Sequence, residues 1–153
     1  MDDSEVIKFV QRQASGAKYV TSICTGAFLL GVAGLLRGRR ATTHWASHPM
    51  LELLGAVPEH ARVVRDGNLI TGGGVTSGID FALTVAAEVY DAKTARGVQL
   101  AMEYDPQPPF DAGSPPRPEA DQNQVRRTLA ESADKRGRVV LRAAESFTAL
   151  PTQ

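Results

Sequence analysis

Lys18-Tyr-Val-Thr-Ser-Ile-Cys-Thr-Gly-Ala-Phe-Leu-Leu-Gly-Val-Ala33 joins a short apolar segment to a longer amphipathic one. Residues 19–23 have the pattern of a buried strand, and residues 25–36 have the apolar face of a helix. Cys24 stands at the junction, with Ser22 two residues before it and Gly26 two residues after it. A sharp strand-to-helix turn crowds both flanking positions, so a nucleophile elbow requires small residues there. The spacing therefore predicts that Cys24 is a nucleophile.

Two readings of this cysteine remain open at the level of local pattern. A sulfur atom at the N-terminus of a helix is favoured as thiolate by the helix dipole and the free N–H groups. A single cysteine also serves commonly as a small buried apolar side chain, with no chemistry at all. The elbow spacing alone does not separate the two.

Composition limits the classes of protein to consider. The 153 residues suffice for one domain with a real core. Lys plus Arg and Asp plus Glu each number 17, and the resulting zero net charge gives no support for a nucleic acid or an anionic membrane as partner. The single cysteine excludes an internal disulfide and a multi-cysteine metal site. With no signal peptide pattern and no apolar run of membrane-spanning length, we expect a soluble cytoplasmic protein without cofactor or metal.

The remaining segments alternate helices and strands. Helices are expected at residues 4–14 (capped by Ser4), 47–54 (closed by Gly55), 79–90, 94–103 and about 121–150, the last interrupted near Gly137. Thr76 or Ser77 is expected to cap the 79–90 helix, with Asp80 completing a capping box with Ser77. Residues 62–65 and 69–71 flank the turn Asp66-Gly67-Asn68 and predict a hairpin. Six prolines make residues 104–118 an extended loop.

This order predicts an α/β fold with a partly parallel sheet. Ligands of such sheets bind at the carboxyl ends of strands. Cys24 and the turn Gly72–Gly74 both follow a strand, so we expect them to face one crevice.

His44 is the candidate partner of Cys24, because an imidazole can take the proton of a thiol. A structural histidine packed beside Trp45 is the alternative. His48 and His60 are less favoured, since they adjoin Pro49 and a hairpin strand. His44 and His48 have a helical metal-ligand spacing, but no third ligand is evident and the proline argues against a helix through both.

Two other motifs invite a functional interpretation. Gly72–Gly74 fits neither the phosphate loop of nucleotide-binding proteins nor the dinucleotide fingerprint. We interpret it as a tight turn whose backbone lines the crevice, with Trp45 as a wall. The basic run Lys135-Arg-Gly-Arg138 is interpreted as a solvated helix face.

At this point a family resemblance becomes visible. The stretches Ser22–Trp45 and Val64–Leu83 resemble the PfpI/ThiJ-type superfamily, which has the class I glutamine amidotransferase-like fold. The triple glycine, Glu103-Tyr104 and the stretch 108–115 are similar to its isocyanide hydratase branch. The resemblance implies one PfpI-type domain over residues 1–153, built as a three-layer α/β/α, flavodoxin-like sandwich with a mostly parallel sheet.

The resemblance also implies roles for individual residues. It makes Cys24 the nucleophile, Thr25 the donor of a backbone N–H and a hydroxyl near the sulfur, and His44 the histidine of the Cys–His pair. The substrate pocket would be lined by Gly26, Trp45, Gly73, Gly74 and Val75.

Members of the superfamily carry a further portion before this region, with the first strands, a carboxylate near the cysteine and a glycine-rich turn. We therefore expect the chain to correspond to the C-terminal two-thirds of the enzyme, to lack the N-terminal strands of the sheet, and to show little turnover alone.

The function implied is that of a lyase (a hydro-lyase) that hydrates isocyanides to N-substituted formamides, acting as a homodimer on a small molecule. Two alternatives remain open. One is the ligand-sensing domain of an AraC-type transcription regulator, for which the residues after the proline-rich loop are too few to form a helix-turn-helix domain. The other is a glyoxalase-like or peptidase-like cysteine enzyme of the same superfamily.

Overall fold

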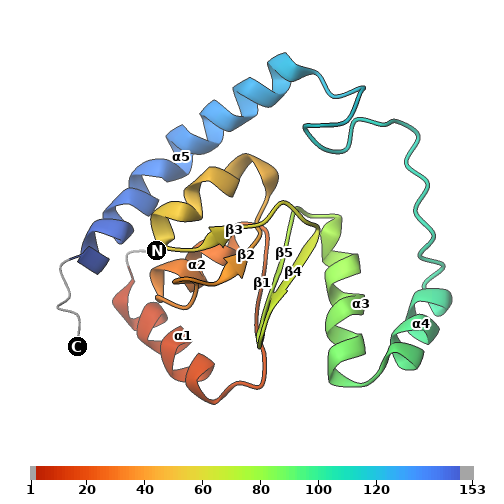
Figure 1. The fold of residues 1–153 in the computed structure, drawn as a ribbon, viewed down its shortest axis with the longest axis horizontal. Coiled ribbons are helices and arrows are strands. Elements are labelled where there is room, and N and C mark those ends of the chain that lie inside the picture. Colours follow the sequence, from red (N-terminus) through yellow and green to blue (C-terminus); the bar gives the residue numbers. More distant parts are fainter. Residues whose placement is uncertain (1–2, 149–153) are drawn as a thin grey trace.

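A small sheet lies at the centre of the computed structural model, which describes residues 3–148 and the side chains of residues 3–145 (Figure 1). Its strand order is β1-β5-β4. Strand β1 (Val20–Ile23) runs parallel to β5 (Leu69–Gly72), so that Ile23 pairs with Gly72. Strand β4 (Val63–Asp66) is antiparallel to β5 and forms the predicted hairpin, whose turn residue Gly67 has the positive φ of 59° that the turn requires.

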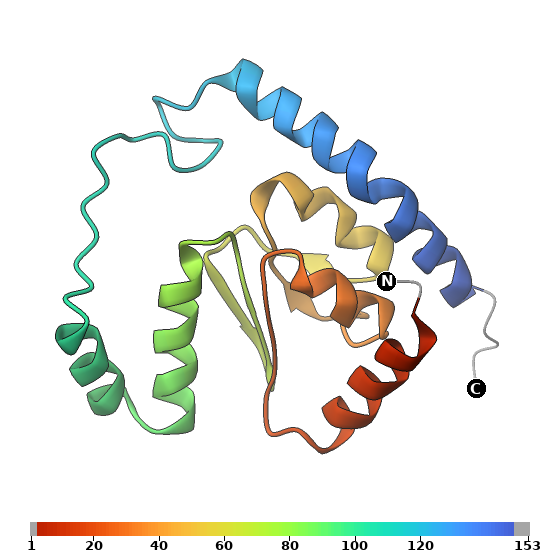
Figure 2. The same cartoon turned by 180° about the vertical axis from the view of Figure 1, so that it is seen from behind.

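Helices cover both faces of this sheet. Helices α1 (Ser4–Gly16) and α2 (Gly26–Val32) lie on one side, and α3 (Ser77–Val89) and α4 (Ala92–Ala101) lie on the other (Figures 1 and 2). A second, parallel pair is formed by the two-residue strands β2 (Arg40–Ala41) and β3 (Val57–Pro58). Among the described residues, β1 has a strand partner only on its β5 side.

The longest helix, α5 (Gln122–Thr148), returns over the body of the molecule (Figure 2). It packs on two short 3-10 helices, η1 (Trp45–Met50) and η2 (Glu52–Leu54), and on α2. Its anchor is Val140, which is completely buried in one core cluster with Phe28 and Leu54. Burying such side chains contributes about 1.5–3 kcal/mol each, and this stabilises the packing of α5 on the core.

Several predicted boundaries were wrong for local reasons. Helix α1 is capped by Asp3 instead of Ser4, because the Asp3 carboxylate accepts the N–H groups of Glu5 and Val6 at 2.9 and 3.3 Å. Helix α2 ends at Val32, ahead of Gly34, which has a φ of 79°. A Cβ atom disfavours that left-handed conformation and glycine does not.

The predicted helix over residues 47–54 is the pair η1 and η2, since Pro49 has no N–H for an α-helical bond. The expected closure at Gly55 is confirmed by its φ of 76°. Helix α5 is not interrupted at Gly137, and its predicted end at Leu150 lies outside the described residues.

The predicted capping box of α3 is also wrong. The Ser77 hydroxyl donates to the carbonyl of Gly74 at 2.5 Å. The Asp80 carboxylate instead forms an ion pair with Arg62 and accepts the hydroxyl of Tyr104 at 2.8 Å. The Asp80 carboxylate thus interacts with residues far away in sequence and not with the start of its own helix. Tyr104 begins the proline-rich segment, which is extended as predicted and leads from α4 to α5 (Figure 1).

Candidate active site

Cys24 adopts a left-handed backbone conformation, with a φ of 55°. It lies directly between β1 and Thr25, the residue that precedes α2. Its N–H donates to the carbonyls of both Gly72 and Gly73, at 3.0 and 2.8 Å. A non-glycine residue in this region costs about 1–3 kcal/mol and persists where the surroundings hold it. The geometry is therefore that of a strained strand-to-helix elbow, at the carboxyl ends of two parallel strands.

The segment that carries His44 is tied to this elbow. The Thr43 hydroxyl donates to the carbonyl of Cys24 at 2.6 Å. The next residue, His44, accepts the N–H of Ala46 at its Nδ1, at 3.2 Å. A Cβ placed on Gly74 would lie 3.0 Å from Cδ2 of His44, so the absence of a side chain on this glycine makes room for the ring.

The protonation of His44 follows from these contacts. Burial, and then the positive charge of Arg136, lower the pKa of His44 below its usual value. The ring is therefore neutral at pH 7. Since Nδ1 acts as an acceptor, the proton of the neutral ring is assigned to Nε2. His44 is thus a hydrogen-bond donor on its Nε2 side, and the described side chains include no hydrogen bond between it and Cys24.

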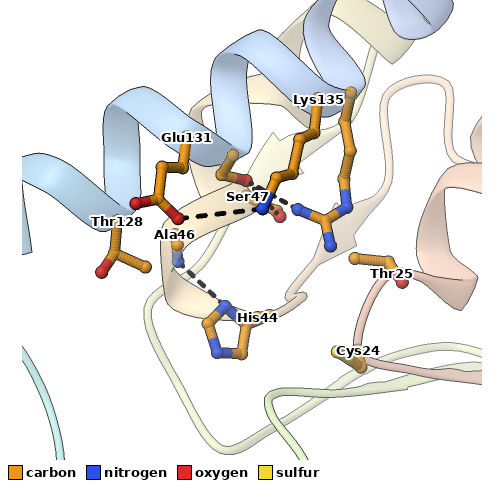
Figure 3. A pocket seen from close by; sticks show the side chains of 10 residues that line it. Cys24, Thr25, His44, Ala46, Ser47, Thr128, Glu131 and Lys135 are labelled. Carbon is orange, nitrogen blue, oxygen red and sulfur yellow. Dashed lines mark hydrogen bonds and ion pairs between the residues drawn. The ribbon is translucent and has the colours of Figure 1, made fainter.

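A cavity of about 260 Å³ opens beside Cys24 and is called the elbow cavity here (Figure 3). The turn after β1 contributes Cys24 and Thr25, and the segment after β2 contributes His44 together with Ala46 and Ser47 at the start of η1. Helix α5 contributes Thr128, Glu131, Ser132, Lys135 and Arg136. Thr25 lines the cavity and makes no side-chain capping bond to α2.

A larger groove of about 990 Å³ adjoins the elbow cavity, and His44 lines both. Of the predicted pocket residues, Trp45, Gly73, Gly74 and Val75 line this groove. Gly26 lines neither space, and a Cβ there would make only an ordinary contact of 3.7 Å with Ser22. The structure therefore brings Cys24, Thr25 and His44 together and places most of the predicted pocket next to them.

The part of the site that sequence reasoning missed is α5. The run 135–138 was interpreted as a solvated face, yet Arg136 is half-buried and lines the elbow cavity. Helical spacings of four, four and three residues relate Ser132, Arg136, Val140 and Ala143, of which all but Arg136 are buried. This repeat was the available signal, because residues spaced in this way share one face of a helix.

His48 is nearly buried at the wall of the groove. It is 3% exposed, its Nε2 lies 3.0 Å from the carbonyl oxygen of Glu59, and its ring stacks on His60 at 3.8 Å. Burial lowers the pKa of His48, the Glu59 carbonyl raises it and His60 lowers it. Within the described part of the chain, no three His, Cys, Asp or Glu side chains gather into a metal-binding group.

The model of the DJ-1/PfpI family matches residues 1–88, more than half of the chain. The chain belongs to the DJ-1/PfpI family. The predicted α/β sandwich with a mostly parallel sheet is confirmed by this match and by a solved THiJ/PfpI family protein from Pseudomonas syringae, with a TM-score of 0.82 and 44% identity. That likeness covers 93% of this chain and 57% of the other.

Two curated relatives differ in what their names say. This DJ-1/PfpI chain is 54% identical to isonitrile hydratase of Pseudomonas putida over 94% of its own length and 64% of that enzyme's. It is 38% identical to the HTH-type transcriptional regulator GlxA of Rhizobium meliloti over 52% of its own length and 25% of the regulator's. The chain thus spans less than two thirds of the length of these relatives. None of its described helices is long and apolar enough to cross a membrane.

Proposed function

We propose that this protein hydrates isocyanides to N-substituted formamides, with Cys24 as the nucleophile. The observation that carries the proposal is the strained elbow of Cys24, open to a cavity that His44 shares. The 54% identity to an isonitrile hydratase supports this reaction over others of the family. It is a lyase reaction that needs no redox step.

The chemistry balances with one water per substrate. The sulfur of Cys24 attacks the terminal carbon of R–N≡C and forms a C–S bond, while the thiol proton passes to that same carbon. The product is a thioimidate, R–N=CH–S. Water then adds its oxygen to the carbon and the nitrogen gains a proton, giving R–NH–CH(OH)–S. The C–S bond breaks, the hydroxyl proton returns to the sulfur, and R–NH–CHO leaves.

His44 acts in this scheme as a hydrogen-bond donor to the substrate nitrogen, which takes its proton from the added water. Its Nε2 carries the proton of a neutral ring, and its Nδ1 is held by the N–H of Ala46. A hydrogen bond of this kind stabilises the charge that develops on the nitrogen as water adds. Thr25 offers its backbone N–H and its hydroxyl to negative charge that develops beside the sulfur.

The groove next to the elbow cavity holds the organic part of the substrate. Trp45, Gly73, Gly74 and Val75 line it, and His44 stands between the two spaces. An isocyano group that enters past His44 reaches the sulfur, while an apolar substituent stays against Trp45 and Val75.

We also propose a cytoplasmic homodimer. Exposed apolar side chains on and after α4 support a self-association surface, with Val98, Leu100 and Met102 exposed by 42%, 83% and 54%. Light scattering on a sizing column measures the mass, and a monomer at all concentrations would contradict the dimer.

The test of the reaction is the formation of formamide from benzyl isocyanide, followed by the NMR signal of the formyl proton. Cys24→Ala should lower the rate at least ~100-fold. Arg138→Gln, an exposed change on α5 outside the cavity, serves as the matched control and should leave the rate unchanged. Hydration by Cys24→Ala at the parent rate would refute the nucleophile. Turnover of phenylglyoxal but not of the isocyanide would favour the glyoxalase-like alternative.

A further inference from the structure

The elbow cavity carries an unbalanced positive charge. Its charged side chains are Glu131, Lys135 and Arg136, all on α5. Glu131 and Lys135 form an ion pair at 3.8 Å and offset one another. His44 is neutral, as derived above. No carboxylate among the described side chains lies within ion-pair distance of Arg136. The positive charge of Arg136 is therefore not neutralised by a neighbouring side chain.

Arg136 contacts one buried hydroxyl group, which is itself held by a second. Ser47 of η1 and Ser132 of α5 are 1% and 3% exposed, and their oxygens lie 3.0 Å apart. The guanidinium donates from one terminal nitrogen to the Ser132 oxygen at 3.3 Å. A guanidinium has five N–H donors in a rigid planar fork, so most of them remain for a ligand. Figure 3 shows the same wall of the cavity, with Glu131 and Lys135 projecting from α5 toward the loops of Cys24 and His44.

We propose that the elbow cavity binds a carboxylate on Arg136, and that the preferred substrates are isocyanides with a carboxylate on the carbon next to the isocyano nitrogen. The substrate class rests on the proposed hydration, whereas the carboxylate site does not. A half-buried guanidinium pairs with a carboxylate through two parallel hydrogen bonds, which a neutral ester cannot replace. A substituent on the same carbon extends past His44 into the groove.

The carboxylate site can be tested without any turnover, because the chain has a single cysteine. Iodoacetate and iodoacetamide both alkylate that sulfur: the sulfur attacks the methylene carbon, the C–S bond forms, the C–I bond breaks and iodide leaves. The reagents differ only in a carboxylate against an amide. The ratio of their rates therefore cancels any change in the reactivity of the sulfur itself and reports on recognition of the anion.

We expect the iodoacetate-to-iodoacetamide ratio of the protein to exceed that of 2-mercaptoethanol about fivefold. Arg136→Gln should abolish the excess, Arg136→Lys should keep part of it, and Arg138→Gln should leave it unchanged. Salt at about 0.5 M should reduce the excess in the parent protein, since it screens the attraction. A parent ratio equal to that of the small thiol overturns the site, even if Arg136→Gln fails to fold.

The substrate class is tested with 2-isocyano-3-phenylpropanoate and its methyl ester. The acid should have the higher kcat/KM by about fivefold, and Arg136→Gln should bring the ratio of acid to ester close to one. Equal turnover of acid and ester by the parent protein overturns this inference and leaves the proposed hydration standing. An anionic preference in alkylation without hydration of either compound supports the carboxylate site and overturns the substrate class for this chain.

Discussion

Thr71 connects the central sheet to the segment that carries His44. It lies on β5 and is completely buried, and its hydroxyl oxygen accepts the N–H of Thr42 at 2.8 Å. Thr42 is 1% exposed. Thr71→Val keeps the shape of the side chain and removes the acceptor, so the N–H of Thr42 is left buried without a partner.

The expected effect is a loss of about 2 kcal/mol in the free energy of unfolding. An unsatisfied buried donor costs about 1–3 kcal/mol, because the group gives up water and gains nothing in return. For a chain of this size, that loss corresponds to a decrease in Tm of about 4–8 °C. Urea unfolding followed by circular dichroism measures the difference, and the slope of the transition should stay unchanged.

Two variants serve as controls. Thr71→Ser keeps the oxygen and loses one methyl group, which should cost about 1 kcal/mol. Thr84→Val removes a hydroxyl that donates to the Asp80 carbonyl inside α3 at 2.8 Å, and it should change stability by less than about 0.5 kcal/mol. If Thr71→Val destabilises no more than Thr71→Ser, the buried N–H is not the cause and the reasoning fails.

Two further predictions concern packing and pH. Gly31→Ala should destabilise by about 1–3 kcal/mol, because its Cβ would lie 2.8 Å from Cβ of Leu54. Its matched control, Gly137→Ala in α5, meets no atom within 4 Å and should stabilise by about 0.5–1 kcal/mol in the same thermal unfolding assay. The lowered pKa of His48 means that the unfolded chain takes up a proton first as the pH falls below about 6.5. Stability should therefore decline from pH 7 toward pH 5, and His48→Gln should flatten that decline; an unaltered pH profile would contradict the assignment.

Local sequence was sufficient to predict the elbow at Cys24 and most of the helices, strands and turns around it. The small residues flanking Cys24, the turn at Gly67 and the prolines of 104–118 act through the conformations that single residues allow, and these do not depend on distant partners. The family resemblance in Ser22–Trp45 pointed to the same cysteine and histidine.

Other features depend on contacts between residues far apart in the chain. Asp80 lost its predicted capping role because Arg62 and Tyr104 compete for its carboxylate. The positive charge beside Cys24 comes from Arg136, more than a hundred residues later, and the spacing of residues along α5 does not show what its inner face packs against. Burial of Val140 determines the orientation of α5, because the helix can bury only one face against η1 and η2. Arg136 lies on that same face. The nucleophile could thus be identified from its neighbours in sequence, whereas the charge that surrounds it is set by the packing of a helix.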